Sequence, residues 1–475
     1  MSPSNRDGHP PGSMHRRTLV VRTAALAGAA LAAPALLRSG ARAQDAVLGA
    51  YQEAKIDWRR LAGETVNVAM IPTTFYAGLI ALAPQFEALT GIKVTFENIP
   101  PGQIRNKTVL DLSSKTGTYS ASFTDPMYYP LYATNKWVVP IEDFLGDSKL
   151  TDTAWYAYDD IIPAWRTANA YNGKTYGVPF DGEATVQTYR SDLYASKALK
   201  AAETLDEFMA NAAAVHDPAN RVWGAALRGF PGPGQNMYIY PSIFLAYDGK
   251  WFDSGGKIRV NGPEAEAALR WYIDLDNKYA PKGVENWNWP DIADAFSQGS
   301  LGAYIDGCSQ AAVIVDPQRS KVVGKVGFAR WPAGPSGRRV TSIWNWGFAV
   351  NGAIPERARQ ATWLFVQWAT CRETQARTSI RAAAGTVARV GVNRVSLLRS
   401  PEFAKMVGDY GGNFLEAMTA SMDHDTDPDW RPRVPQWPAI GETMSVAIQQ
   451  ALSGQQTPKA ALDGAQRRIE QVMRG

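Results

Sequence analysis

Hydrophobic and polar positions follow two patterns over residues 66–97, and together these patterns predict one β-α-β unit. Apolar and polar residues alternate one by one over 66–70, which is typical of a strand. Leucine and phenylalanine then recur at helical spacing over 79–89, Gly91 is placed to end that helix, and 92–97 alternates again. Two strands joined by a helix in this way are expected to pair as parallel neighbours.

Helical and strand-like patterns continue to alternate along most of the chain, which predicts an α/β fold. Thr204 and Glu207 form a capping-box pattern at the start of one helix. The turn formers of 229–234 predict a loop, and no Gly-Lys-Ser/Thr follows to make it a phosphate site. The clearest predicted helices cover 204–215, 263–279, 355–370, 440–452 and 457–472.

The N-terminal segment predicts export. Arg16-Arg17 precedes an uncharged run over 23–37, and Ala41-Arg42-Ala43 offers a small-x-small cleavage site. We interpret residues 1–43 as a twin-arginine signal peptide that is cleaved after Ala43, which places the mature protein in the periplasm. A membrane anchor is the alternative, but the run is shorter than the about 20 residues that span a bilayer core.

Removal of this segment changes the formal net charge from +4 to −1, because the segment holds six arginines and one aspartate. The excess of basic over acidic residues therefore belongs to the signal peptide, and no nucleic-acid partner is expected. The remaining chain is longer than one hydrophobic core usually supports, so two domains are predicted. The two cysteines, Cys308 and Cys371, are compatible with an exported disulfide, but their sequence separation leaves the pairing open.

Seven segments carry a resemblance to a known family: 86–94, 137–141, 171–179, 296–307, 326–335, 346–351 and 435–463. Their order and spacing resemble the extracellular solute-binding proteins, family 1, of carbohydrate ABC importers, which are maltose-binding-like. The resemblance implies an α/β fold of two lobes, each a mixed sheet flanked by helices, with a ligand cleft that closes by hinge motion. By the same resemblance the first lobe comprises 64–180 with 346–373, and the second comprises 181–345 with 374–475.

The resemblance also implies the function and the partners. It implies a monomeric periplasmic protein that captures a sugar, polyol or short glycoside and delivers it to the membrane permease subunits of an importer. Neither a cofactor nor a catalytic step is expected. A ligand of this kind needs aromatic faces for its carbon skeleton and polar groups for its hydroxyls. Candidate aromatic contacts, each with ordinary core packing as its alternative, are Tyr128, Tyr238, Trp344, Trp346, Trp430 and Trp437.

Asp181 and Glu183 are the leading polar candidates. The segment around them resembles the family's crossing strand, whose carboxylate at the position of Glu183 reaches the ligand in maltose-type relatives. Both side chains are expected on one face, since strand residues repeat every two positions. The alternative is an exported polysaccharide-active enzyme that uses the pair as general acid and base for glycoside hydrolysis. No other part of the chain resembles a glycosidase, so binding is the favoured interpretation.

Departures from the family pattern limit the ligand. Ser309 stands where many relatives carry a stacking tryptophan, and Thr73 stands where maltose-type relatives place charged residues that bind hydroxyls. A monosaccharide, polyol or short glycoside is therefore expected rather than a maltose-like oligosaccharide. Asp125 and Asn236 fall near contact loops of the family. Arg431 would suit an anionic ligand, although a solvated arginine is the simpler expectation.

No metal site is expected. Acidic residues alternate over 423–429 as in a calcium loop, but Pro428 replaces the required glycine and Val434 occupies the place of the bidentate glutamate. A solvated acidic loop is predicted instead. Only His216 and His424 remain after signal removal, too few for a histidine-rich zinc site.

Overall fold

The computed structural model describes residues 48–72, 76–382 and 389–474. The chain divides into two compact units, Met1–Ala50 and Tyr51–Gly475, and the second contains every element discussed below. The predicted signal peptide and its cleavage site lie outside the described residues. Within the described ranges, no helix has the length and apolar character that crossing a membrane requires.

Five strands form the first sheet in the order β2-β1-β3-β12-β6. β1 is parallel to β2 and β3, whereas β12 is antiparallel to β3 and β6. The sheet is therefore mixed, because β12, a strand from late in the sequence, lies between β3 and β6 and runs antiparallel to both. The bounds are β1 Thr65–Met70, β2 Lys93–Asn98, β3 Ala121–Thr124, β6 Val178–Pro179 and β12 Gly347–Val350.

The predicted β-α-β unit is confirmed. α2 covers Ala77–Thr90 between β1 and β2, and the two strands pair in parallel from Thr65↔Lys93 to Met70↔Asn98. Gly91 ends the helix with φ 71°, and its N–H donates to the carbonyl oxygen of Glu87. Glycine suits this left-handed position because it lacks a Cβ.

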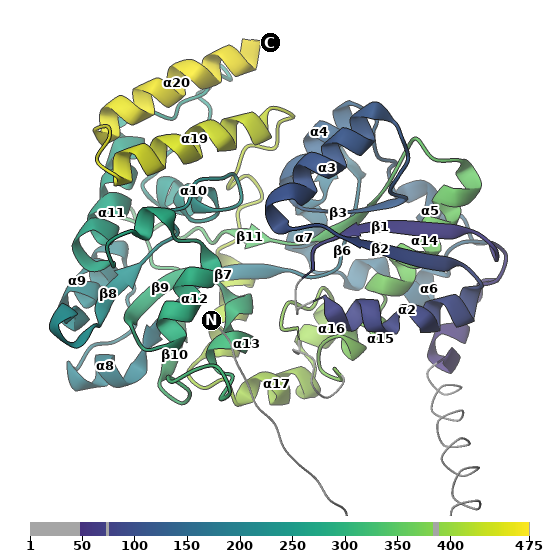
Figure 1. Ribbon diagram of the computed structural model, residues 1–475, viewed down its shortest axis with the longest axis horizontal. Helices are drawn as coiled ribbons and strands as arrows, with labels where there is room; N and C mark the ends of the chain where they lie inside the picture. The colour runs from purple at the N-terminus through teal and green to yellow at the C-terminus, as the bar shows by residue number, and fades with distance from the viewer. Residues whose placement is uncertain (1–47, 73–75, 383–388, 475) are drawn as a thin grey trace, which may run out of the picture. The chain divides into compact units, whose positions relative to one another are not determined.

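Five strands also make up the second sheet, in the order β10-β7-β9-β8 with β11 paired to β7. β7 is antiparallel to β9, β10 and β11, and β8 is parallel to β9. Figure 1 shows β7 and β11 on the path between the two groups of elements. The bounds are β7 Glu183–Arg190, β8 Trp223–Ala226, β9 Leu301–Gly307, β10 Val326–Ala329 and β11 Ile343–Trp344.

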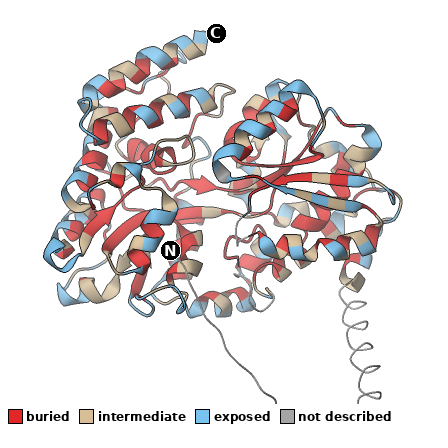
Figure 2. Ribbon diagram, viewed as in Figure 1, coloured by how far each residue is buried: buried red, intermediate tan, exposed pale blue. Residues whose placement is uncertain are grey.

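Helices flank each sheet, and buried residues lie both on the central strands and on the helix faces that cover them (Figure 2). This arrangement confirms the predicted α/β class with two open sheets. Beside the first sheet lie α3 Pro101–Ser114, α4 Tyr129–Thr134, α5 Glu142–Gly146, α6 Thr153–Tyr156, α7 Pro163–Ala168, α14 Glu356–Thr370, α15 Arg372–Arg377 and α16 Val395–Leu398. Beside the second lie α8 Ser191–Ser196, α9 Leu205–Val215, α10 Asn236–Ala246, α11 Pro263–Tyr279, α12 Trp289–Ser297, α13 Ala311–Ile314, α17 Pro401–Gly408 and α18 Phe414–His424. The last two helices, α19 Trp437–Leu452 and α20 Pro458–Arg474, pack on each other and on α11.

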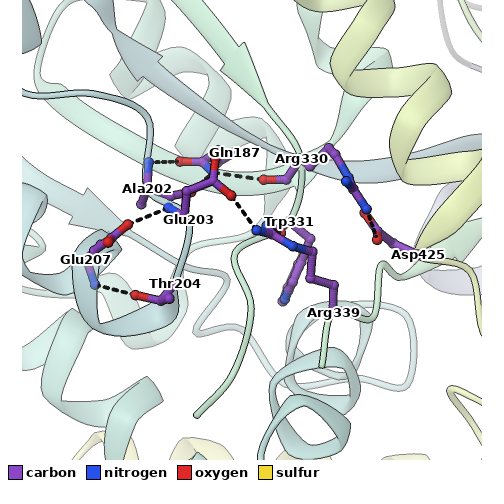
Figure 3. A network of polar contacts seen from close by, with 9 residues as sticks. All are labelled: Gln187, Ala202, Glu203, Thr204, Glu207, Arg330, Trp331, Arg339 and Asp425. Carbon is purple, nitrogen blue, oxygen red and sulfur yellow. Dashed lines mark hydrogen bonds and ion pairs between the residues drawn. The ribbon is translucent and has the colours of Figure 1, made fainter. Parts of the chain in front are cut away.

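The cap of α9 differs from the predicted capping box in one contact (Figure 3). The Thr204 hydroxyl accepts a hydrogen bond from the N–H of Glu207 at 3.2 Å, as predicted. The Glu207 carboxylate, however, accepts from the N–H of Glu203 at 2.6 Å rather than from the N–H of Thr204. The glutamate thus reaches one residue further back, where Glu203 also pairs with Arg339.

The acidic loop over 423–429 is only partly solvated, so the prediction for it was wrong in one respect. Asp425 is buried and its Oδ2 accepts from Arg330 Nε at 3.0 Å (Figure 3). The Arg330 carbonyl in turn accepts from the side-chain amide of Gln187 on β7 at 2.8 Å. The carboxylate is therefore used to hold the loop against the second sheet. No group of possible metal ligands occurs within the described residues.

The segment after α14 contacts the first sheet and its helices, although we predicted it for the second lobe. Thr374 shares a hydroxyl contact with Tyr51 at 3.0 Å, and Asn393 donates to the carbonyl of Pro179 at 2.5 Å. The lobe boundaries themselves remain a prediction. Both cysteines are free and buried, Cys308 directly after β9 and Cys371 between α14 and α15.

Candidate functional site

A cavity of about 140 Å³ lies where segments of the two sheet groups meet. At about 10 to 15 Å³ for one water, this volume holds roughly ten water-sized groups. Residues from both sheet groups contribute to its wall, which suits a ligand held between two lobes. The lining comprises Ile71, Tyr76, Arg105, Asp181, Gly182, Glu183, Arg228, Gly234, Gln235, Tyr238, Trp289, Ser309, Gln310, Trp344, Trp346, Arg389, Val390 and Gly391.

A β-bulge at the crossing between the sheets aims two carboxylates at the cavity. Trp344 pairs with Glu183 and Gly347 pairs with Pro179, so three residues on one chain segment face two on the other. The Trp346 carbonyl accepts from the N–H groups of both Phe180 and Asp181, at 2.7 and 3.2 Å. Two donors on one carbonyl define a bulge of this kind, and bulges are common where a side chain must be re-aimed at a site.

Glu183 has an environment that favours its neutral form. Its side chain is partly open to the cavity but lies deep in the protein, and this burial raises its pKa to about 7. The Ser309 hydroxyl donates to its Oε2, and the charge of Arg228 also favours ionisation. Asp306 and Asp181 oppose ionisation through their own charges. A ligand hydroxyl that donates to Glu183 would stabilise the ionised form.

Asp181 is already engaged by groups of the protein on both oxygens. Its Oδ1 accepts from the N–H of Trp346 at 2.6 Å, and its Oδ2 accepts from the Tyr76 hydroxyl at 2.5 Å. Burial raises its pKa, against the opposing effects of Arg389 and the Tyr76 hydrogen bond. Asp181 therefore joins the start of α2 to both crossing segments while it lines the cavity.

Three arginines line the cavity, and two of them are each held by an aspartate whose side chain is fully buried. Arg105 Nε of α3 lies 2.8 Å from Oδ2 of Asp125, which follows β3. Arg228 Nε, in the segment after β8, lies 2.7 Å from Oδ2 of Asp306 on β9, in a two-bond pair. Bidentate and buried charge pairs fix a guanidinium far better than exposed ones do. Each group of elements thus presents one fixed cationic donor.

Aromatic rings form a large part of the remaining wall. Trp344 and Trp346 lie 5.9 Å apart between ring centroids, and Tyr238 meets Trp344 edge to face at 5.6 Å. Arg228 lies over the Tyr238 ring at 4.6 Å. Rings held in this way offer flat apolar faces to the carbon chain of a ligand beside the charged donors and acceptors.

Several polar atoms at the cavity have no hydrogen-bond partner among the described residues. Buried polar groups without a partner are rare and costly, so the side chains that carry these atoms have unused hydrogen-bonding capacity beside the cavity. The atoms in question, all buried, are Gln235 Oε1, the Tyr238 hydroxyl, Gln310 Oε1 and Arg389 Nε.

The structure brings five of the sequence-predicted residues to the cavity: Asp181, Glu183, Tyr238, Trp344 and Trp346. Asp125 lies behind Arg105, where its Oδ1 also accepts from the N–H of Met127 at 3.1 Å. The wall as described does not include Tyr128, Asn236, Trp430 or Trp437. Thr73 lies outside the described residues.

The four predicted residues away from the wall have other contacts. Asn236 donates to the carbonyl of Ser445 at 2.8 Å, and Tyr128 packs against Tyr132 at 5.7 Å between centroids. Trp430 and Trp437 pack around the guanidinium of Arg431, at 4.1 and 5.8 Å. The same guanidinium lies 4.9 Å from the ring centroid of Trp344. Trp430 and Trp437 therefore support the region behind Trp344.

Arg431 is buried, so the expectation of a solvated arginine was wrong. Its Nη1 contacts the sulfur of Met127 at 3.1 Å, and burial lowers its pKa to about 10. Stacking on three indole rings compensates part of the lost hydration, since guanidinium groups bind well to aromatic faces.

Sequence reasoning missed the three cavity arginines. Arg228 carried a usable signal, because it comes two residues after a strand-like run, at the end where ligands of α/β sheets bind. Arg105 looked like any charged residue on an amphipathic helix, and Arg389 lies in a stretch without a clear pattern. Their common surroundings exist only in the folded chain.

Known proteins resemble this chain along most of its length. The family model described as bacterial extracellular solute-binding protein matches residues 72–376. The mannitol-binding protein of Pseudomonas aeruginosa is 24% identical over 430 residues, which cover 86% of this chain and 93% of that protein.

Two solved structures share the fold. A solute-binding protein of Agrobacterium radiobacter K84 in complex with ribitol is 27% identical, with a TM-score of 0.77 over 86% of this chain and 99% of that one. A solute-binding protein of Agrobacterium vitis S4 with bound D-mannitol is 26% identical, with a TM-score of 0.76 over 87% and 99%. Both are two-lobed binding proteins of ABC transporters, in accord with the two sheet groups seen here.

Proposed function

The chain belongs to the bacterial extracellular solute-binding proteins and serves an ABC importer, and from this premise we propose that its solute is a short acyclic polyol. The supporting observation is the cavity itself, in which fixed donors, carboxylates and unpartnered polar atoms surround a small space with aromatic faces. A polyol carries one hydroxyl on each carbon and so needs donors and acceptors on every side. Relatives with bound ribitol and D-mannitol support the same class.

The size of the cavity supports a short ligand. Room for roughly ten water-sized groups suits an alditol of five or six carbons, whereas a malto-oligosaccharide has several times that number of heavy atoms. Ser309 contributes a small hydroxyl that donates to Glu183, and a serine side chain offers no aromatic face for a sugar ring. Specificity then depends on matching hydroxyls to groups that would otherwise stay unpaired.

We propose the following course of capture. The open protein is a monomer that binds the polyol on one lobe, and the second lobe closes over it by rotation about the crossings at Asp181 and Trp346. The closed form then docks on the permease subunits of the importer. Residues 1–43 would direct the chain to the periplasm before this cycle begins.

Titration calorimetry and thermal melting with ribitol, D-mannitol, erythritol, D-glucose and maltose test the proposal. At a hundred times its Kd, a cognate polyol should stabilise the fold by about 2.7 kcal/mol through mass action. Binding of glucose or maltose but of no polyol would refute the ligand class.

Hydrolysis of a glycoside is the rival function, and family members are substrate-binding proteins. One observation favours the rival, namely that a buried Glu183 with a pKa of about 7 would suit a general acid. Asp181, however, has a raised rather than a lowered pKa, and its oxygens already accept two hydrogen bonds. NMR of maltose after prolonged incubation with the protein decides the matter, because a hydrolase cleaves the glycosidic bond and a binding protein leaves it intact.

A further inference from the structure

The loop over 229–234 leads into α10 and forms one edge of the cavity. Its last residue, Gly234, lines the wall, and its carbonyl accepts from Arg228 Nη1 at 3.1 Å. Arg228 is itself held by the buried Asp306, so the loop is anchored to the second sheet group through a fixed guanidinium. The loop therefore has a definite structural position, although its sequence only indicated turns.

Arg105 approaches the same loop from the first sheet group. It projects from α3, its Nε is bound to Asp125, and its guanidinium carbon lies 5.6 and 5.2 Å from the ring centroids of Trp344 and Trp346. The Arg105 side chain remains 18% exposed while that of Asp125 is fully buried. The guanidinium is thus fixed at the mouth of the cavity by a carboxylate behind it and two indoles beside it.

Gly234 has no side chain at the point where these groups meet. A Cβ built there would lie 3.0 Å from Arg105 Nη2 and 3.0 Å from Trp344 Cη2, which is closer than ordinary van der Waals contact. The backbone at Gly234 does not need glycine, since its φ is outside the left-handed region, unlike that of Gly232 at 149°. The close approach of Arg105, rather than backbone conformation, is what a side chain at this position would disturb.

We propose that Arg105 holds the two lobes in the closed form of the site. The lack of a side chain at Gly234 lets the second lobe close against the Arg105 guanidinium. This inference rests on the proposed binding function and adds to it the contact that holds the ligand in. Opening must separate Arg105 from Gly234 and from the indole of Trp344. Loss of the contact should therefore act mainly on ligand dissociation, as most changes at an interface do.

Two variants disturb the contact in different ways. Arg105→Ala removes the guanidinium, whereas Gly234→Ala adds a methyl group and removes nothing that could touch a ligand. Lys107→Ala is the matched control, because Lys107 lies on the same helix in an exposed 2.6 Å pair with Glu97. The probes are D-mannitol and ribitol, with dissociation followed by stopped-flow tryptophan fluorescence and lobe separation by small-angle X-ray scattering.

Both Arg105→Ala and Gly234→Ala should raise the dissociation rate by about tenfold or more, with a smaller change in the association rate. Lys107→Ala should match the wild type. If Arg105 only touches the ligand, Gly234→Ala will dissociate at the wild-type rate, and that result would overturn the proposal. Melting curves of the free proteins show whether each variant is folded, and Arg105→Lys, which shortens the contact without filling the space at Gly234, serves as the second variant if Gly234→Ala is not.

The scattering data separate this inference from the proposed function. If the wild type binds neither polyol, the proposed ligand class fails. The inference is then decided on the free proteins, which sample both open and closed forms. Loss of the contact shifts this population toward the open form, so Arg105→Ala and Gly234→Ala should have a larger radius of gyration than the wild type and Lys107→Ala. Equal radii in all four proteins would overturn it.

Discussion

Polyol affinity should rise between about pH 5 and pH 8, and Glu183→Gln should remove this dependence, because Glu183 must ionise to accept the ligand hydroxyls fully. Burial raises its pKa in the free protein to about 7, so the free carboxyl is mostly neutral in mild acid. Hydroxyl donors from a ligand stabilise the carboxylate. Binding therefore releases a proton wherever the free form is neutral and the bound form is charged.

The magnitude follows from the shift. With a pKa of about 7, Glu183 is ionised in on the order of one free molecule in a hundred at pH 5. If bound hydroxyls return its pKa to the ordinary value of 4.5, affinity at pH 5 is lower than at pH 8 by on the order of seventyfold. Glu183→Gln should bind with a flat profile, at an affinity below that of the wild type at pH 8.

Stability of the free protein should follow the opposite trend. The folded pKa of about 7 lies above the unfolded value of 4.5, so the folded state holds the proton more tightly. The resulting stability is fully present below pH 4.5 and is lost as the pH rises through about 7, by at most about 3 kcal/mol. Two opposite pH trends from one side chain are a demanding test.

Calorimetry in buffers of different ionisation enthalpy measures the released proton directly, with ribitol or D-mannitol as the ligand. Urea unfolding of the free protein over the same pH range measures stability. Proton uptake on binding would refute the reasoning, as would an unchanged pH profile in Glu183→Gln. Asp181 is the internal comparison, because its two oxygens already accept hydrogen bonds from Tyr76 and Trp346.

Three further predictions concern export and stability. Replacement of Arg16 and Arg17 by lysine should leave the precursor uncleaved in the cytoplasm, whereas N-terminal sequencing of the exported wild type should begin directly after the predicted cleavage site. Asp306→Asn should lower the free energy of unfolding by about 3 to 5 kcal/mol, since it leaves a buried arginine unpaired. The exposed pair of Asp274 offers the control, with an expected loss of less than about 1 kcal/mol for Asp274→Asn in urea titration. Gly182→Ala should lower both Tm and polyol affinity, because its Cβ would overlap a buried indole beneath the bulge. An unchanged Tm in Gly182→Ala would show that the crossing segment can shift to make room for the methyl group, and would contradict the prediction.

Local sequence determined the elements because their causes are local. The alternation over 66–70 and the glycine at 91 specify a strand, a helix end and a second strand within a span that the chain itself connects. Helix α11 begins at Pro263 as predicted, since proline fits the first helical turn without loss of a hydrogen bond. Such features need no knowledge of distant residues.

Part of the site could also be predicted. The crossing segment with Asp181 and Glu183 lines the cavity together with Trp344 and Trp346, and ligand binding by these residues stays a prediction. For the other aromatic residues in loop-like segments, sequence could not distinguish a ligand contact from a packing residue. A tryptophan that stacks on a ligand and one that packs on Arg431 look alike in sequence. Their roles depend on which side of the wall they occupy.

Sequence by itself thus determined the α/β class and the main helices of this protein, and the family resemblance pointed to the crossing carboxylates. Tertiary structure alone decided which charges are paired and which remain available. Arg228 and Asp306 are 78 positions apart, and Arg105 and Asp125 are 20 apart, yet in each pair the arginine meets a fully buried carboxylate. The pKa of Glu183 and the close approach at Gly234 likewise arise from groups that only the folded chain brings together. The physical reason is that periodicity acts between neighbours in sequence, whereas desolvation, charge pairing and steric contact act between neighbours in space.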